Sequence, residues 1–220
     1  MPAKKGKKVT KKQQTEWPTK WNLIGTAVII VLFIVEAILI LQPWRKPEVT
    51  QTDAERFATE YTRVEKENPF VYRDAEEVIK ILEHGTGVVF LGFPECQWCQ
   101  AYVKYVAEVA RDKGMDTIYY YNIAADRRDN TAEYQKIVEI LDEHLQYDDE
   151  GNRRIYVPNI TFVIEGEIIG NDWESSKDTL GYKNATDYWT EERVGALKVR
   201  LADWMQKIVD TKGCVTTCNE

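Results

Sequence analysis

Residues 87–99 read GVVFLGFPECQWC, and this stretch decides how the rest of the chain is interpreted. Its first part, residues 87–93, is a continuous apolar run, which is typical of a central strand covered on both faces. A helical pattern, AYVKYVAEVARDKG, follows the motif and ends at Gly114. The two cysteines, Cys96 and Cys99, are therefore predicted to lie where a buried strand passes into a helix.

This placement gives the two sulfurs different chemistry. The first, on Cys96, faces the unpaired backbone N–H groups and the positive dipole end of the helix, which stabilise a thiolate over a thiol. The second, on Cys99, lies one turn further in, where it can attack a mixed disulfide formed by the first. A C-x-x-C pair also occurs in zinc sites, but a pair that follows a buried strand in a βαβ pattern favours thiol–disulfide exchange.

Strands and helices alternate on both sides of the motif. Upstream, residues 70–72 form a short β run, and Asp74 is the predicted N-cap of a helix ending near Gly85. Downstream, we expect a strand at residues 116–122 and a helix at residues 131–145. Two strands follow, at residues 156–164 and 167–170, joined by Glu165 and Gly166. The chain then continues with a loop insertion at residues 172–189 and a last helix from 190 to about 209. The order β-α-β-α-β-α-β-β-α predicts the α/β class, with a mixed central sheet flanked by helices.

These residues resemble the thioredoxin superfamily over residues 68–210. The resemblance rests on VVFLGFPECQWC with its helix, on Val157-Pro158 ahead of the ITFVIEGEIIG hairpin, and on the closing helix. Among subgroups, the chain is most similar to membrane-anchored thioredoxin-like proteins of Gram-positive bacteria, including the bacteriocin-transport accessory type.

The resemblance implies a role for each site residue. Cys96 would be the nucleophile and Cys99 the resolving thiol. Pro158 would follow a cis peptide bond, and the backbone at Val157 would pair with the bound substrate chain. Trp98, between the cysteines in sequence, would shield the sulfurs or contact the substrate.

Two departures from the family pattern stand in the motif itself. The dipeptide between the cysteines is Gln97-Trp98, rather than Gly-Pro, Pro-His or Gly-His. The buried acid that thioredoxins carry on the preceding strand falls here on Phe90. The sequence therefore leaves the redox direction open between oxidase, reductase and isomerase.

The amino-terminal part predicts a membrane anchor. Residues 1–22 carry seven lysines and one glutamate, and residues 23–41 read LIGTAVIIVLFIVEAILIL. Nineteen helical residues span roughly 28 Å, close to the thickness of the hydrocarbon core of a bilayer. A cleaved signal peptide is the competing interpretation, but a small-residue cleavage site is missing after the run. The lysines then predict a cytoplasmic amino terminus and an extracytoplasmic domain.

Charge and patterning bound the remainder of the chain. Residues 42–220 hold 22 basic and 34 acidic residues, so the folded part would repel nucleic acid. Residues 42–67 are polar with apolar positions at helical spacing, which predicts either a stalk or an extra helix packed on the domain. No metal-ligand spacing such as H-E-x-x-H is present, and no cofactor is expected.

A second cysteine pair, Cys214 and Cys218, lies in the tail formed by residues 211–220. A local disulfide is the favoured interpretation in an oxidising compartment. An auxiliary redox pair that exchanges with Cys96 and Cys99 is the second, and a zinc site made by all four thiolates is the third.

The sequence thus predicts a membrane-anchored, extracytoplasmic thiol–disulfide oxidoreductase. Its partners would be cysteine-containing proteins and a membrane redox protein that recycles the pair. The main rival is a non-enzymatic thioredoxin-fold accessory subunit of an export or surface complex, in which the Cys96–Cys99 bridge is structural. Metal delivery or storage through thiolates is a further alternative.

Overall fold

The computed structural model describes residues 25, 27–33, 51–173 and 181–217, with side chains to residue 211. The chain divides into two compact units, Met1–Thr50 and Gln51–Glu220. In the first unit, residues 27–33 are helical, and most of the predicted span 23–41 lies outside the described residues. Within the described residues, no helix combines the length and the apolar character needed to cross a membrane.

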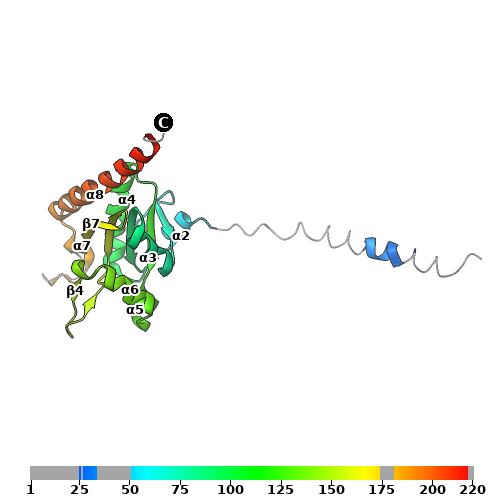
Figure 1. Cartoon of the computed structure of the whole chain (residues 1–220), viewed down its shortest axis with the longest axis horizontal. Helices are drawn as coiled ribbons and strands as arrows, with labels where there is room; N and C mark the ends of the chain where they lie inside the picture. The colour runs from blue at the N-terminus through cyan, green and yellow to red at the C-terminus, as the bar shows by residue number, and fades with distance from the viewer. Residues whose placement is uncertain (1–24, 26, 34–50, 174–180, 218–220) are drawn as a thin grey trace, which may run out of the picture. The chain divides into compact units, whose positions relative to one another are not determined.

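Five strands form one mixed sheet in the second unit, in the order β1-β3-β2-β6-β7. Figure 1 labels strand β7 of this sheet and the helices around it. Strands β1, β3 and β2 are parallel to one another, whereas β6 pairs antiparallel with both β2 and β7. All six residues of β2 are buried, which confirms the central strand predicted from its apolar run. The strands are β1 (Phe70–Tyr72), β2 (Gly87–Gly92), β3 (Ile118–Asn122), β6 (Asn159–Ile164) and β7 (Glu167–Asp172).

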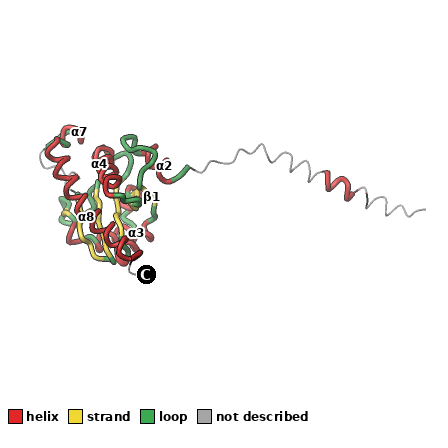
Figure 2. Tube along the Cα trace, turned by 90° about the horizontal axis from the view of Figure 1, so that it is seen from above, coloured by secondary structure: helices red, strands yellow, loops and turns green. Residues whose placement is uncertain are grey.

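Helices flank this sheet (Figure 2). Helix α3 packs against α6, and α4 packs against α8. Their bounds, with the smaller elements between them, are α2 (Asp53–Glu60), α3 (Ala75–His84), α4 (Gln97–Lys113), α5 (Ala124–Asp129), α6 (Ala132–Ile140), η2 (Asp142–His144), β4 (Gln146–Tyr147), β5 (Arg153–Arg154), α7 (Ala185–Tyr188) and α8 (Glu191–Thr217). The α/β class is confirmed, and the arrangement fits a thioredoxin-like fold.

Helix α2 is part of the core of this unit. It begins with a capping box, in which Thr52 and Glu55 bond each other's backbone N–H groups. Phe57 on its inner face stacks on Phe70 of β1, with ring centroids 3.9 Å apart. Tyr61, directly after the helix, is also fully buried. Of the two interpretations of this region, the structure therefore favours a helix packed on the domain.

Local signals placed several element ends correctly. Asp74 caps α3 through the N–H of Glu77, and α4 ends at Gly114, whose φ of 66° is left-handed. Glu165 and Gly166 both have positive φ, at 51° and 82°, and join β6 to β7 in a tight hairpin.

Two helices end elsewhere than predicted. The helix expected over residues 131–145 stops at Ile140, because the buried Leu141 turns the chain into η2 and on toward β4. The last helix continues to Thr217, beyond the end expected near Val209. The structure also adds α5, a short helix with no buried residue and so no apolar pattern to reveal it.

Candidate functional site

Cys96 caps the helix that follows the central strand. The backbone at Cys96 is extended (φ −79°, ψ 108°), and its sulfur accepts a hydrogen bond from the Cys99 N–H at 3.1 Å. Such a bond normally goes to the oxygen of Ser, Thr, Asp or Asn. A sulfur in this place gains the most when it carries a negative charge, because it then faces unpaired N–H groups and the positive end of the helix dipole.

The two thiols are free and differ in access. Cys96 is half-buried, whereas Cys99 is 0% exposed. Gly92, the last residue of β2, allows this burial. A Cβ at Gly92 would lie 3.2 Å from the Cys99 sulfur and 3.0 Å from the ring tip of Phe90. The strand therefore ends in a residue without a side chain because the inner sulfur occupies the space beside it.

Electrostatics sharpen the difference between the sulfurs. The pKa of Cys96 is lowered, first by a hydrogen bond from the Cys99 thiol, then by the N–H groups of Cys99 and Trp98 and by the charge of Arg127, against the opposing effect of burial. The pKa of Cys99 is raised well above its ordinary value, chiefly by burial. The surroundings thus favour the thiolate form on the accessible sulfur and disfavour it on the buried one.

The segment before β6 lies against the outer sulfur. The peptide bond between Val157 and Pro158 is cis, as the resemblance implied. The carbonyl oxygen of Val157 lies 3.8 Å from the Cys96 sulfur, which donates to it as a thiol. Cys96 and Val157 are sixty-one residues apart in the sequence. The pairing of β2 with β6 therefore brings Cys96 together with Val157 and Pro158.

Trp98 meets a part of the chain that gave no sequence signal. Its half-buried ring lies 5.4 Å from the ring of Tyr188 in an edge-on contact. Tyr188 ends α7, within the region expected to be a loop insertion, and its own ring contacts Trp189. The sequence could not predict this contact because residues 172–189 lack periodicity.

The inner side of the site is aromatic where thioredoxins carry an acid. Phe90 is fully buried, and its ring stacks against that of Tyr120. The hydroxyls of Tyr61 and Tyr120 lie 3.2 Å apart, and both lie close enough to Cys99 for a charge on that sulfur to raise their pKa. Burial raises the pKa of each tyrosine, so both hydroxyls stay neutral. Cys99 therefore borders neutral hydroxyls and rings on this side.

Arg127 is the residue that sequence reasoning missed. It lies on α5, and its guanidinium is 5.1 Å from the ring of Phe93. Its Nη1 donates to the carbonyl of Ile155 at 3.3 Å. Arg127 sits in a charged segment, RRDN, that reads as ordinary surface. Only the tertiary contact with residue 155 shows that it belongs beside the cysteines.

The tail cysteines are largely outside what can be described. Cys214 falls within the backbone of α8, and Cys218 lies outside the described residues. The local disulfide, the auxiliary pair and the shared zinc site therefore remain predictions. Among the described residues, no group of three or more His, Cys, Asp or Glu is placed to hold a metal ion.

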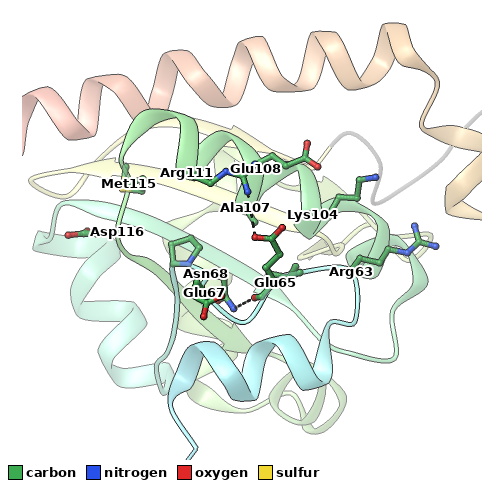
Figure 3. Close-up of a pocket in the computed structure, with 12 residues that line it drawn as sticks. Arg63, Glu65, Glu67, Asn68, Lys104, Ala107, Glu108, Arg111, Met115 and Asp116 are labelled. Atoms are coloured by element: carbon green, nitrogen blue, oxygen red, sulfur yellow. Dashed lines mark hydrogen bonds and ion pairs between the residues drawn. The ribbon is translucent and has the colours of Figure 1, made fainter.

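A separate pocket of about 300 Å³ lies beside the other end of α4 (Figure 3). We call it the mixed-charge pocket, because basic and acidic side chains alternate around it. Arg111 faces Glu65 across it at 3.7 Å. Its lining comes from residues 63–69 and 104–116 and includes neither cysteine of the C-x-x-C pair.

Comparison with known proteins gives no relative. The sequence matches no family model, and no curated protein matches it. Function is therefore inferred from the geometry around Cys96 and Cys99.

Proposed function

We propose that this protein is a thioredoxin-like thiol–disulfide oxidoreductase that acts on cysteine-containing proteins. The observation that carries the proposal is the contrast within one helical turn. Cys96 is accessible and its pKa is lowered, whereas Cys99 is buried and its pKa is raised. Exchange needs this pairing of a reactive thiolate with a second thiol that waits for the mixed disulfide.

In the reducing direction, the Cys96 thiolate attacks one sulfur of a substrate disulfide. A bond forms between Cys96 and that sulfur, the substrate S–S bond breaks, and the other substrate sulfur leaves as thiolate. Cys99 then loses its proton and attacks the Cys96 sulfur. The Cys96–Cys99 bond forms, the bond between Cys96 and the substrate breaks, and the second substrate sulfur leaves as thiolate. The substrate is thus released with both sulfurs reduced, and two electrons have moved from protein to substrate. The oxidising direction is the same sequence reversed.

The surroundings give roles to the other site residues. The backbone at Val157, followed by Pro158, lies against the Cys96 sulfur, where a substrate chain carrying the target sulfur would have to approach. Trp98 lies between the two cysteines in the sequence, its side chain is half-buried, and its ring contacts the ring of Tyr188 edge-on. We assign Trp98, Val157 and Pro158 to substrate contact.

The cellular setting follows from the amino-terminal sequence. The apolar run at residues 23–41, preceded by seven lysines in residues 1–22, supports a single-pass anchor with a cytoplasmic amino terminus. The domain would act outside the cytoplasm, as in the Gram-positive thioredoxin-like proteins that the motif resembles. A membrane redox protein would restore the pair after each turnover.

The decisive experiment traps the intermediate. In Cys99→Ser, the mixed disulfide between Cys96 and substrate cannot be resolved, so covalent adducts that dithiothreitol releases should accumulate. Cys96→Ser is the matched control and should trap none. Equal trapping by both variants, or by neither, would contradict the assignment of roles.

The accessory-subunit alternative makes the opposite claim about the same bond. A structural bridge should stay oxidised in glutathione or dithiothreitol buffers poised below about −300 mV, whereas an exchanging pair should be reduced at a higher potential. The lowered pKa of Cys96 supports an exchanging pair, since a permanent bridge has no use for a stabilised thiolate.

A further inference from the structure

A basic pocket adjoins the C-x-x-C site. It has a volume of about 600 Å³ and lies between α5, α6 and the hairpin of β4 and β5. We call it the arginine pocket, since three arginines line it in a domain that is acidic overall. Its lining residues are Arg127, Asn130, Tyr134, Gln135, Val138, Tyr147, Asp148, Gly151, Asn152, Arg153 and Arg154.

One of these arginines has partners of its own within the protein. Arg153 pairs with Asp142 at 3.1 Å and donates to the carbonyl of Leu145 at 2.6 Å. Its guanidinium also lies 4.0 Å from the centre of the Tyr147 ring. The position of Arg153 is thus explained by the fold alone, and it has a structural role in holding the hairpin.

The other two arginines lack such partners. Within the described part of the chain, neither Arg127 nor Arg154 forms an ion pair. Arg154 is exposed and lies 5.9 Å from the ring of Tyr156, whereas Arg127 donates one hydrogen bond, to the carbonyl of Ile155, and lies 5.1 Å from the ring of Phe93. The two face each other closely enough for Arg154 to lower the pKa of Arg127 further, after burial, which is the larger cause. Two like charges therefore share one pocket at an energetic cost.

The one carboxylate in the pocket lining is already in use. Asp148 Oδ1 accepts hydrogen bonds from the backbone N–H groups of Glu150 and Asn152, at 3.0 Å and 2.8 Å. These bonds hold the turn of the hairpin. Arg154 lowers the pKa of Asp148 through its charge but forms no ion pair with it among the described residues. With three arginines and one aspartate in its lining, the pocket thus keeps a net positive charge.

The arginine pocket is connected to the reactive sulfur through a single stretch of backbone. Arg127 binds the carbonyl of residue 155, and the carbonyl of residue 157 lies 3.8 Å from the Cys96 sulfur. The same segment thus carries one contact to the guanidinium and one to the thiol. Because Ile155 and Val157 are two residues apart, a chain bound alongside Val157 would come close to Arg127.

We propose that Arg127 and Arg154 bind a carboxylate of the substrate, so that the protein selects polypeptides with Glu or Asp close to the reacting cysteine. This inference rests on the proposed exchange function. A carboxylate fits because the planar guanidinium offers paired N–H donors to its two oxygens. It would also relieve the repulsion between the two arginines. The acidic remainder of the domain would repel such a substrate elsewhere and so direct it to this pocket.

The test uses single-cysteine peptides and the oxidised full chain. One glutamate is placed in turn at each of three positions on either side of the cysteine, and each peptide has a matched glutamine version. The rate at which the peptide thiol opens the Cys96–Cys99 disulfide is measured by stopped flow. The Glu-to-Gln rate ratio should reach about five to ten for at least one position, as expected for a charge-assisted contact in a half-open site.

Three variants locate the preference. Arg127→Gln and Arg154→Gln should each bring the ratio close to one. Arg128→Gln is the matched control, since Arg128 is the neighbouring residue on α5, is exposed and pairs with Asp129. It should keep the ratio of the unaltered protein. The ratio cancels any change in the reactivity of Cys96, because both peptides meet the same sulfur.

The outcomes separate the two proposals. Exchange with every peptide at a ratio near one in the unaltered protein, or a ratio unchanged in Arg127→Gln and Arg154→Gln, would overturn the arginine pocket and leave the exchange function standing. If no peptide reacts, binding is measured with serine in place of the peptide cysteine. Glutamate-dependent binding lost in Arg127→Gln would then support the pocket while the exchange function fails, and its absence would overturn both.

Discussion

The two ends of α4 differ in how their charged groups are paired. At its carboxyl end, Arg111 lies 3.7 Å from Glu65 (Figure 3). Glu108 lies 2.7 Å from Lys198. At its amino end, the Cys96 sulfur has a lowered pKa and accepts a hydrogen bond from the backbone N–H of Cys99, and the charge of Arg127 also favours its thiolate form. At the carboxyl end, both of these charged side chains of the helix thus form ion pairs with other side chains of the protein. The amino end leaves a nucleophile and a guanidinium for another molecule to meet, which distinguishes a functional surface from an ordinary one.

Gly92→Ala should have the largest effect of the three substitutions, because it disturbs the packing at the amino end of α4. The new Cβ would lie 3.0 Å from the Phe90 ring and 3.2 Å from the Cys99 sulfur, both fully buried. Overpacking of this kind costs about 1–3 kcal/mol in the free energy of unfolding, measured by urea denaturation of the reduced protein. Gly195→Ala is the control, because no atom lies within 4 Å of its Cβ, and a helical alanine should stabilise by about 0.5–1 kcal/mol. An equally stable Gly92→Ala would refute the tight packing.

Arg127→Gln should have a smaller effect, which is to lower the reactivity of the Cys96 thiol at the amino end of α4. Loss of its positive charge raises the pKa of Cys96, so less thiolate is present at a pH well below the ordinary thiol pKa of about 8.5. Alkylation of Cys96 by iodoacetamide should therefore slow about two- to fivefold there, and the loss should disappear as pH rises above the pKa of both proteins. Arg128→Gln should alkylate at the original rate. A uniform loss at every pH would point to altered access instead.

Glu65→Gln tests the carboxyl end and should have the smallest effect. Both partners of the ion pair are largely exposed, with side-chain exposures of 65% for Arg111 and 77% for Glu65. Exposed pairs of this kind contribute less than about 1 kcal/mol, so thermal unfolding should shift little and the alkylation rate of Cys96 should stay unchanged. A slowed thiol reaction in this variant would mean that the two ends are coupled along the helix.

The sequence predicted those parts of the fold that depend on interactions between residues close together in the chain. The apolar run of β2, the cap at Asp74 and the hairpin turn at Glu165 were recognisable because each depends on neighbours in sequence. The position of both cysteines at the start of α4 followed from the same signals. The cis bond before Pro158 came from the family resemblance rather than from the residues alone.

The features that escaped prediction depend on distant contacts. Arg127 lies on a helix without buried residues, so nothing in its neighbourhood distinguishes it from Arg128. The support of Trp98 by Tyr188 joins segments ninety residues apart, through a region without periodicity.

The hydrogen bond between Cys96 and Val157 also has a consequence for how the chain matures. Its partners are separated by 61 residues, so a growing chain carries both cysteines well before the segment that completes their surroundings exists. At about 5–20 residues per second, that interval is on the order of 3–12 s of synthesis. During it, Cys96 has neither the neighbouring carbonyl nor the fixed position of Arg127, both of which depend on residues 155–157. The part of the enhanced thiol reactivity that Arg127 supplies is therefore acquired late, with the finished fold, whereas the part that Cys99 and the N–H group of Trp98 supply depends only on the start of α4.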